Sequence, residues 1–310
     1  MASRSEDDRP RALVTGHDGF TGRYVARELE AAGYRVIGLS HVAAAAADTI
    51  VADLLDREAL GAAISRTKPD VVVHLAAIAF VAHGDAEALY RVNVLGTRNL
   101  LEALAASGHV PRIVVLASSA NIYGNAEVEP ITEDTPPAPA NDYAVSKLAM
   151  EYMSRLWMDR LPIAVTRPFN YTGVGQAPQF LIPKLVAHFR RREPEIELGN
   201  IGVWRDFSDV RDVARAYAGL VAAAPAGEVV NICSGRAHSL EEILEMMAGI
   251  AGYRIAVRVN PEFVRASEVV RLVGSNRKLQ DVVGGAPPTT LPETLRWMYG
   301  AGEEHAVHPD

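Results

Sequence analysis

The chain has 310 residues, of which 49% are hydrophobic, so it is long enough to bury one large core or two unequal ones. Its 31 Lys and Arg residues are outnumbered by 38 Asp and Glu residues, which argues against a surface that binds nucleic acid. No apolar run approaches the ~18 residues that a membrane span requires, and the polar first ten residues lack the apolar core of a signal peptide. We therefore expect a globular cytoplasmic protein that binds neither membranes nor nucleic acids.

Cys233 is the only cysteine of the chain, so no intrachain disulfide can form, and a cysteine-based metal site would have a single thiolate. We expect Cys233 to be a small buried residue, and we expect no metal site.

A glycine-rich loop follows the first apolar segment. The pattern predicts a short buried strand at residues 11–14, a loop at residues 15–22 and an amphipathic helix to about Ala32. The loop has glycines at positions 16, 19 and 22, which let the backbone turn tightly and approach a pyrophosphate at the helix N-terminus, where free N–H groups favour anions. The loop indicates a dinucleotide site, and a plain tight turn is the alternative.

The second predicted strand, residues 34–39, should end beside the adenosine ribose of such a cofactor. Sites that prefer NAD carry an acidic residue at this point, which holds the 2′-hydroxyl. This chain has Ser40 and His41 there, and the missing carboxylate favours NADPH. No arginine follows the strand to hold the 2′-phosphate, so Arg23 and Arg35 are the candidates for that role.

Two further segments are expected to border the cofactor. Asp53 and Leu54 follow a short apolar stretch and are placed at the adenine edge. A buried strand at residues 70–75 ends at the small residues Ala76 and Ala77, where a cofactor can lie close to the backbone.

A long helix is predicted at residues 84–108 from its apolar stripe. Asn93 is polar within this stripe, so we expect it to pair with neighbouring backbone. His74, on the strand before it, is expected to be a packed or capping histidine and not a base.

Tyr143 and Lys147 form a candidate acid/base pair. Pro136, Pro137 and Pro139 allow a helix to begin only near Asn141, which places the phenol and the ammonium one turn apart on one face. A positive charge about 4 Å away favours the phenolate by about three pKa units, which would make the tyrosine a usable acid/base. The alternative is a pair of exposed helix neighbours.

Ser119 lies just after a predicted strand at residues 112–117, at the sheet edge where open parallel sheets bind ligands. Its hydroxyl could donate a hydrogen bond to a carbonyl that Tyr143 protonates. The alternative is that Ser118 and Ser119 satisfy local backbone.

With strand, glycine loop, serine and Tyr-x-x-x-Lys in this order, the chain from residue 11 to about 299 resembles the extended short-chain dehydrogenase/reductase family. The resemblance implies an α/β fold, a Rossmann-type doubly wound parallel sheet with a smaller C-terminal α/β substrate lobe. It implies an NAD(P)-binding domain of residues 11–172 with 206–235, a nucleotide-sugar-binding lobe of 173–205 with 236–300, and tails at 1–10 and 303–310.

The resemblance also assigns roles to residues. It makes Ser119, Tyr143 and Lys147 the catalytic triad, in which Lys147 lowers the tyrosine pKa and holds the nicotinamide ribose. The implied cofactor contacts are Gly16, Asp18, Gly19, Phe20, Gly22, Ser40, Asp53, Leu54, Leu75, Ala76, Ala77, Tyr143, Lys147 and Pro168, for NADP (as NADPH) more than for NAD.

Three segments are similar to those of nucleotide-sugar enzymes, and two of these, residues 199–210 and 265–275, to the GDP-sugar branch. The third, residues 167–176, resembles the turn between cofactor and substrate. Arg205 and Arg265 would hold the diphosphate, because a guanidinium binds phosphate oxygens in pairs, and Glu268 would hold the nucleoside ribose. The implied substrate contacts are Ser119, Asn121, Asn170, Lys184, Arg205, Arg265 and Glu268.

Dehydratases of this branch carry an acid directly after the catalytic serine or threonine, where this chain has Ala120 and Asn121. The resemblance therefore favours reduction of the C4 ketone of GDP-4-keto-6-deoxy-D-mannose to GDP-D-rhamnose. The alternatives are a reductase that forms GDP-6-deoxy-D-talose, an NAD-dependent UDP-hexose 4-epimerase, and a non-enzymatic nucleotide-binding protein. Residues 78–85, which should border the sugar, lack the serine and proline residues typical of the family.

Helices 84–108 and 141–160 resemble those through which family members dimerise as a four-helix bundle. A homodimer is expected on this ground, unless their apolar stripes only pack on their own sheet.

Overall fold

A seven-stranded sheet, in which every pairing is parallel, dominates the computed structural model, which describes residues 9–42, 48–79, 85–263, 269–285 and 287–301. Its strand order is β10-β6-β5-β4-β1-β2-β3, so the chain winds outward in both directions from β1 and β4. This is the doubly wound sheet predicted from the sequence, which is confirmed. The strands are β1 (Arg11–Thr15), β2 (Arg35–Ser40), β3 (Thr49–Val51), β4 (Val71–His74), β5 (Ile113–Ala117), β6 (Ile163–Pro168) and β10 (Val229–Ile232).

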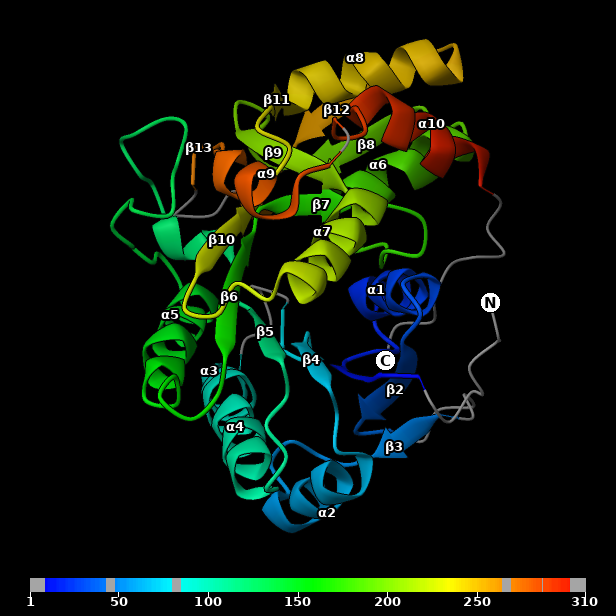
Figure 1. Ribbon diagram of the computed structural model, residues 1–310. Helices are drawn as coiled ribbons and strands as arrows, with labels where there is room; N and C mark the ends of the chain where they lie inside the picture. Colours follow the sequence, from blue (N-terminus) through cyan, green and yellow to red (C-terminus); the bar gives the residue numbers. More distant parts are fainter. Residues whose placement is uncertain (1–8, 43–47, 80–84, 264–268, 286, 302–310) are drawn as a thin grey trace.

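Helices cover both faces of this sheet (Figure 1). One face packs against α1 (Phe20–Ala31), α7 (Val210–Ala223) and α9 (Arg277–Val283), and the other against α2 (Arg57–Thr67), α4 (Thr97–Ala106) and α5 (Asp142–Arg155). Successive strand residues alternate between the two cores, so the central strands are apolar at nearly every position.

The long helix expected at 84–108 is interrupted. It consists of α3 (Ala86–Tyr90), the π-helical turn η2 (Arg91–Gly96) and α4, and residue 84 lies outside the described residues. Asn93 lies in the π-helical turn, where its side chain pairs with the backbone N–H and C=O of Ile78 at 2.9 and 3.2 Å and donates to Ser146 Oγ at 3.0 Å. The expected pairing of Asn93 with backbone is therefore confirmed, and it attaches this helix to α5.

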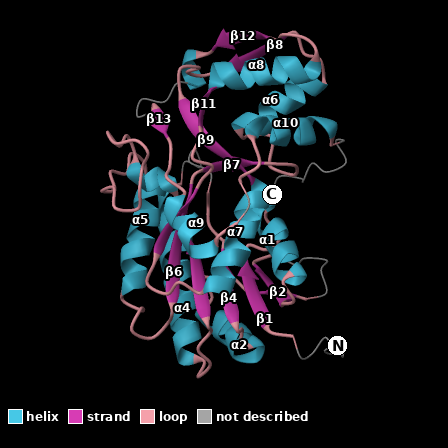
Figure 2. Cartoon of the chain, turned by 45° about the horizontal axis from the view of Figure 1, so that its top comes forward, coloured by secondary structure: helices cyan, strands magenta, loops and turns pink. Residues whose placement is uncertain are grey.

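The remaining strands form two small sheets at one end of the large sheet (Figure 2). Strand β6 leads almost directly into β7 (Asn170–Thr172), which pairs with β9 (Trp204–Asp209). Strand β9 also pairs with β11 (Ala237–Ser239) and β13 (Arg271–Leu272), and β8 (Glu195–Leu198) pairs with β12 (Ala256–Val259). A third core joins β8 and β9 to the helices α6 (Leu181–Arg190), α8 (Leu240–Ala251) and α10 (Leu291–Gly300). The division into two domains at the boundaries given above stays a prediction.

Candidate active site

The glycine-rich loop between β1 and α1 is packed too closely for a side chain at two positions. Gly16 has a φ of 66°, and a Cβ atom there would lie 2.9 Å from the backbone nitrogen of Ala76. A Cβ atom on Gly22 would overlap the carbonyl oxygen of Gly16. Helix α1 begins after Gly19 without a side-chain cap and has no acidic residue in its first turn, so its N-terminus offers backbone N–H groups to an anion. The loop therefore fits a dinucleotide pyrophosphate.

Thr15 joins the ends of β1 and β4 beside this loop. Its Oγ1 lies 2.7 Å from His74 Nδ1 and accepts a hydrogen bond from the backbone N–H of Ala76 at 3.1 Å. His74 Nε2 lies 2.9 Å from Thr97 Oγ1, and burial and then the charge of Lys147 lower the pKa of His74 to about 3. Both ring nitrogens are engaged and the ring is neutral, which confirms that His74 is a packed histidine.

Ser119, Tyr143 and Lys147 lie together at the end of β5, and each side chain is at most 7% exposed. Ser119 caps the 3₁₀ helix η3 (Ala120–Tyr123) and is hydrogen-bonded to Tyr143. Asn141 caps α5, as expected from the prolines before it, so Tyr143 and Lys147 lie in its first two turns. Lys147 Nζ donates to the carbonyl oxygen of Ala117, the last residue of β5, at 2.8 Å.

The pKa of the Tyr143 phenol is raised to about 12, mainly because burial disfavours the phenolate, while the hydrogen bond with Ser119 acts in the opposite direction. The net direction is thus opposite to the one expected, because burial is the largest contribution to this pKa, and the effect of Lys147 on it stays a prediction. Burial also lowers the pKa of Lys147 to about 8, against the raising effect of Glu151. At neutral pH the tyrosine keeps its proton and the lysine its charge.

Asn121 supports the orientation of the Ser119 hydroxyl. Its backbone N–H and its side-chain Nδ2 each donate to Ser119 Oγ at 3.2 Å. Because Ser119 Oγ accepts both of these bonds, its proton is available to Tyr143 or to a carbonyl oxygen. In this arrangement Asn121 acts on the serine, and its contact with a substrate stays a prediction.

Glu151 and Arg167 form a buried ion pair one helical turn beyond Lys147, which the sequence motifs did not single out. Arg167 Nε and Nη2 donate to the two carboxylate oxygens at 3.1 and 2.8 Å, and Nη1 donates to Tyr123 Oη at 2.9 Å. Tyr123 in turn donates to Asn231 Oδ1 at 2.8 Å. The spacing of Tyr143, Lys147 and Glu151 at i, i+4 and i+8 is the signal in the sequence that could have found the pair.

The glycine loop also touches the first small sheet, a contact that the sequence did not indicate. The rings of Phe20 and Tyr171 are stacked with centroids 6.1 Å apart, and Thr21 Oγ1 lies 2.8 Å from Tyr171 Oη. Tyr24 Oη donates to the carbonyl oxygen of Val174 at 2.8 Å. The start of α1 is thereby fixed to β7 and the turn after it.

The other predicted cofactor contacts border the ends of the same strands. Ser40 ends β2 and is buried, and its hydroxyl donates to Asp18 Oδ2 at 2.8 Å. Asp53 is exposed and accepts from the backbone N–H of Leu55 at 2.9 Å, while Leu54 is buried. Leu75, Ala76 and Ala77 follow β4, and Pro168 ends β6.

The predicted substrate contacts are described in part, because Arg265 and Glu268 lie outside the described residues. Asn170 begins β7. Lys184 Nζ donates to the Glu197 carbonyl oxygen at 2.8 Å and lies 5.0 Å from the ring centroid of Phe263.

Arg205 Nη1 donates to the carbonyl oxygens of Trp204 and Val270 at 2.9 and 3.3 Å. Lys184 and Arg205 thus lie against the residues that flank the segment 264–268 on its two sides. Their role in substrate binding stays a prediction.

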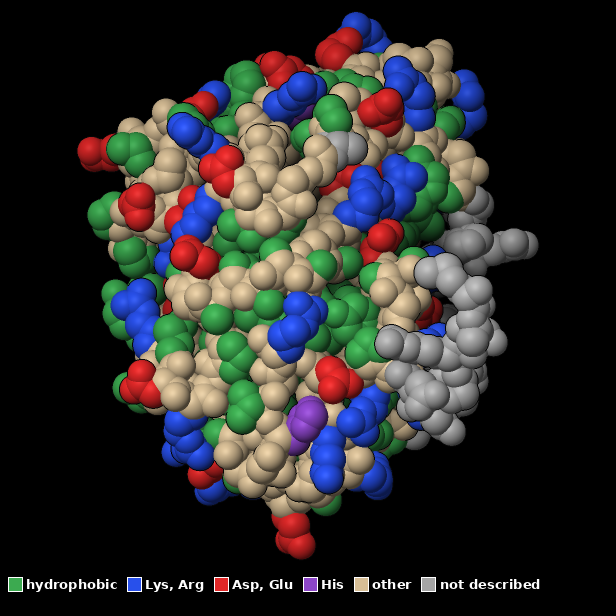
Figure 3. Space-filling model, in the orientation of Figure 1, with side chains coloured by type: hydrophobic (Ala, Val, Ile, Leu, Met, Phe, Trp, Pro, Cys, Tyr) green, Lys and Arg blue, Asp and Glu red, His purple; other side chains and the backbone are tan. Residues whose placement is uncertain are grey.

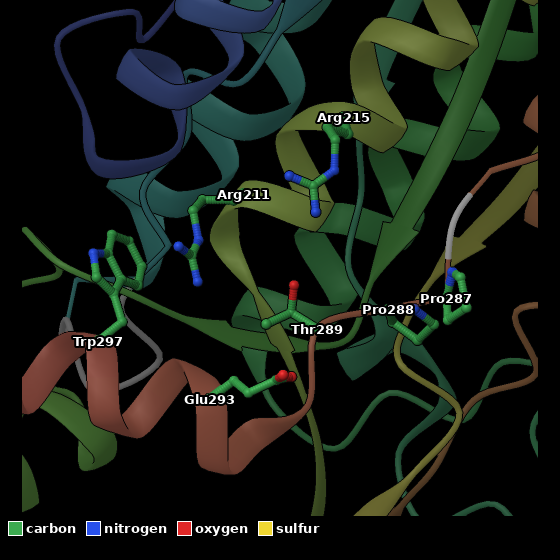
Figure 4. A pocket seen from close by; sticks show the side chains of 7 residues that line it. All are labelled: Arg211, Arg215, Pro287, Pro288, Thr289, Glu293 and Trp297. Atoms are coloured by element: carbon green, nitrogen blue, oxygen red, sulfur yellow. The ribbon is translucent and has the colours of Figure 1, made fainter.

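A cavity of about 690 Å³ lies apart from these residues, between α7 and α10 (Figure 4). Its charged side chains already have partners, since Arg211 Nη2 is 2.7 Å from Asp209, Arg215 is paired with Asp212, and Glu293 accepts from the hydroxyl of Thr290. We assign it no function. Its lining residues are Arg211, Arg215, Pro287, Pro288, Thr289, Glu293 and Trp297.

The described surface carries mixed charge. On the face shown in Figure 3, Lys and Arg side chains are interspersed with Asp and Glu. Among the described residues, no three His, Cys, Asp or Glu side chains are grouped as metal ligands, and no helix combines the length and the apolar character of a membrane span. Cys233 is buried, as expected, and its thiol is free.

Two relatives are similar to the chain over most of its length. The GDP-6-deoxy-D-talose 4-dehydrogenase of Aggregatibacter actinomycetemcomitans is 34% identical over 277 residues, 88% of this chain and 91% of the relative. The GDP-6-deoxy-D-mannose reductase of Pseudomonas aeruginosa is 36% identical over 299 residues, 92% of this chain and 95% of the relative.

Three solved structures have the same fold. One from Burkholderia cenocepacia J2315 has 55% identity and a TM-score of 0.88, covering 94% of this chain and 98% of the other. The RMD structure from Pseudomonas aeruginosa, complexed with NADPH, has 35% identity and a TM-score of 0.82 with the same coverage. The UDP-glucose 4-epimerase of Thermus thermophilus, in complex with NAD, has 31% identity and a TM-score of 0.82 over 94% of this chain and 100% of the other.

The family model described as the NAD dependent epimerase/dehydratase family matches residues 12–233. These residues include the glycine loop, Ser119, Tyr143 and Lys147. The chain therefore belongs to the NAD dependent epimerase/dehydratase family, within the extended short-chain dehydrogenases/reductases, and is an NAD(P)-dependent oxidoreductase.

Proposed function

We propose that the protein reduces the C4 ketone of a nucleotide sugar, with GDP-4-keto-6-deoxy-D-mannose as the substrate and GDP-D-rhamnose as the product. The observation that carries this proposal is the buried Tyr143, hydrogen-bonded to Ser119 and followed one turn later by Lys147. The names of the two similar relatives, which concern GDP-6-deoxy sugars, support the class of substrate.

The side chains can divide the reaction between them. A bound nicotinamide dinucleotide supplies the hydride to C4. Ser119 and Tyr143 donate hydrogen bonds to the ketone oxygen, and Tyr143 gives up its proton as the carbon–oxygen double bond becomes single. One ketone, one reduced dinucleotide and one proton thus yield one alcohol and one oxidised dinucleotide. Lys147 holds a positive charge nearby, which stabilises the phenolate left on Tyr143 until solvent returns the proton.

The residues after Ser119 argue against dehydration. Eliminating water from the sugar requires an additional acid and base. Ala120 has no such group, and the amide of Asn121 is engaged with Ser119. Reduction needs no acid at either position.

GDP-6-deoxy-D-talose is the second candidate product, favoured by the relative from Aggregatibacter actinomycetemcomitans. The two products differ only in the face of the ketone that receives the hydride. A UDP-hexose 4-epimerase would use the same serine, tyrosine and lysine but would return the hydride, so it would consume no dinucleotide.

The residues that contact the sugar nucleotide are proposed from the arrangement of the two smaller sheets. In this proposal residues 173–205 and 236–300 form the sugar-nucleotide lobe, and Asn170, Lys184 and Arg205 contact the substrate together with Arg265 and Glu268. The location of Lys184 and Arg205 beside the flanks of segment 264–268 supports this grouping.

The cofactor is a nicotinamide dinucleotide, and two observations bear on whether it carries a 2′-phosphate on its adenosine ribose. The sequence favours NADPH because no carboxylate follows β2. The structure, however, brings the Asp18 carboxylate to Ser40 at the end of that strand. This carboxylate lies at the strand end where the adenosine ribose of the dinucleotide is expected to bind.

We also propose that the protein is a homodimer through α5 and the helix of α3, η2 and α4. Leu100 and Leu104 pack on their own sheet, but a second apolar face remains exposed. Leu95 is 50% exposed, and Val145 and Tyr152 on α5 and Leu156 directly after it, at spacings of seven and four, are 38%, 54% and 80% exposed. A four-helix bundle with a second copy would cover this face. The cytoplasmic location stays a prediction.

The experiment that tests the function supplies GDP-4-keto-6-deoxy-D-mannose and follows NADH and NADPH absorbance in parallel, with the product resolved by NMR. We expect stoichiometric oxidation of one dinucleotide, and the coupling of H4 separates rhamnose from talose. Interconversion of UDP-hexoses without net oxidation would replace the reductase by an epimerase.

A further inference from the structure

The end of β2 carries a carboxylate that the local sequence does not supply. Ser40 is the last residue of β2 and is 4% exposed, and its hydroxyl donates to Asp18 Oδ2 at 2.8 Å. Asp18 belongs to the glycine loop, 22 residues earlier in the chain. The backbone N–H of Gly16 donates to the carbonyl oxygen of Leu39 at 3.1 Å, which fixes the loop against the same strand end. The acid thus reaches this strand end from a neighbouring element.

This location matters because the end of the second strand is where a Rossmann-type sheet meets the adenosine ribose. A carboxylate there accepts a hydrogen bond from a free 2′-hydroxyl, whereas a 2′-phosphate needs a cation. The inference rests on the proposed dinucleotide site, because it concerns the ribose of that same cofactor.

The charges around Asp18 favour a free 2′-hydroxyl on the ribose over a 2′-phosphate. Its hydrogen-bond donor Ser40 is neutral, so that bond does not cancel the carboxylate charge. Arg35 begins β2, at the end opposite Ser40, and its Nη2 is paired with Asp48 at 3.1 Å, while Arg23 Nε donates to the carbonyl oxygen of Gly19 at 3.4 Å. A phosphate at this strand end would therefore meet a negative charge.

We propose that Asp18, held by Ser40, selects NADH over NADPH by accepting a hydrogen bond from the 2′-hydroxyl and repelling the 2′-phosphate. This reverses the preference expected from the residues that follow β2. It also assigns a specificity role to a loop residue that otherwise has no catalytic part.

The test measures direct binding, without sugar substrate, by titrating the protein with NADH and with NADPH and following dinucleotide fluorescence. The wild type should bind NADH roughly ten- to a hundredfold more tightly, the range expected for a hydrogen bond to a charged group. Asp18→Asn keeps the shape and removes the charge, and it should bring the two dissociation constants close together, mainly by tightening NADPH. Asp18→Ser is a second variant with the same expected result. Asp159→Asn removes a charge from an exposed turn and should leave the ratio unchanged.

Three results would overturn the proposal. A wild type that binds NADPH as tightly as NADH, or an unchanged ratio in both Asp18 variants, would remove the role of Asp18 while leaving the reductase intact. Failure of the wild type to bind either dinucleotide would remove both the selection and the proposed function.

Discussion

Glu151→Gln should destabilise the protein strongly, because Glu151 belongs to a buried ion pair. The side chains of Glu151 and Arg167 are 3% and 6% exposed, and two hydrogen bonds of 2.8 and 3.1 Å join them. Replacing one partner leaves the arginine charge buried without its counter-ion, which typically costs about 3–5 kcal/mol. This is a large part of the roughly 5–15 kcal/mol by which proteins of this kind are stable.

Urea denaturation, followed by circular dichroism, measures this loss as a change in the free energy of unfolding. Glu87→Gln is the matched control, because Glu87 is 80% exposed and 3.7 Å from Arg91, so its loss should change stability by less than about 1 kcal/mol. The double variant Glu151→Leu, Arg167→Met removes both charges and should be more stable than Glu151→Gln. A loss below about 1 kcal/mol in Glu151→Gln would refute the reasoning, since the pair would then not be desolvated.

Four further outcomes are expected. The pKa of Lys147 is lowered to about 8, so between about pH 8 and the ordinary lysine pKa the folded protein binds fewer protons than the unfolded chain. Over this range the stability of the wild type relative to Lys147→Met should rise with pH in denaturation experiments at stepped pH. A difference in stability that stays constant with pH would contradict the lowered pKa. Gly22→Ala should weaken dinucleotide binding at least about tenfold, because its Cβ would overlap Gly16. Gly61→Ala has open space around its Cβ in α2 and should instead stabilise the protein by about 0.5–1 kcal/mol without affecting binding. Leu156→Glu should convert the proposed dimer to a monomer in light scattering, and a wild type that is already monomeric would remove the dimer.

Much of the fold follows from local patterns. Strands β1, β4 and β5 are buried on both faces, which requires apolar residues at nearly every position, and these runs are readable in the sequence. Helix α8 spans residues 240–251, because Ser239 and Glu242 form a capping box at its start and Gly252 ends it in a left-handed conformation, and both signals stand in the sequence. The π-helical turn at 91–96 was not predicted, since its apolar stripe reads as an ordinary helix.

The sequence predicts which residues form the site better than it predicts their pKa values. The spacing of Tyr143 and Lys147 places both at the start of α5. Spacing alone, however, cannot give the depth of burial, which raises the tyrosine pKa instead of lowering it. The contact between Asp18 and Ser40 is likewise tertiary, because it depends on how the glycine loop packs on β2. A sequence reading that looks for an acid only after the second strand therefore misses it.

The most direct test of the proposed reduction compares the wild type with Tyr143→Phe on GDP-4-keto-6-deoxy-D-mannose, with dinucleotide binding measured on the same samples. If Tyr143 is the proton donor, the variant should lose about 10²–10⁴-fold in turnover while its affinity for the dinucleotide stays close to that of the wild type. An undiminished turnover number in Tyr143→Phe would contradict the mechanism, because no phenol would then be needed to protonate the ketone oxygen.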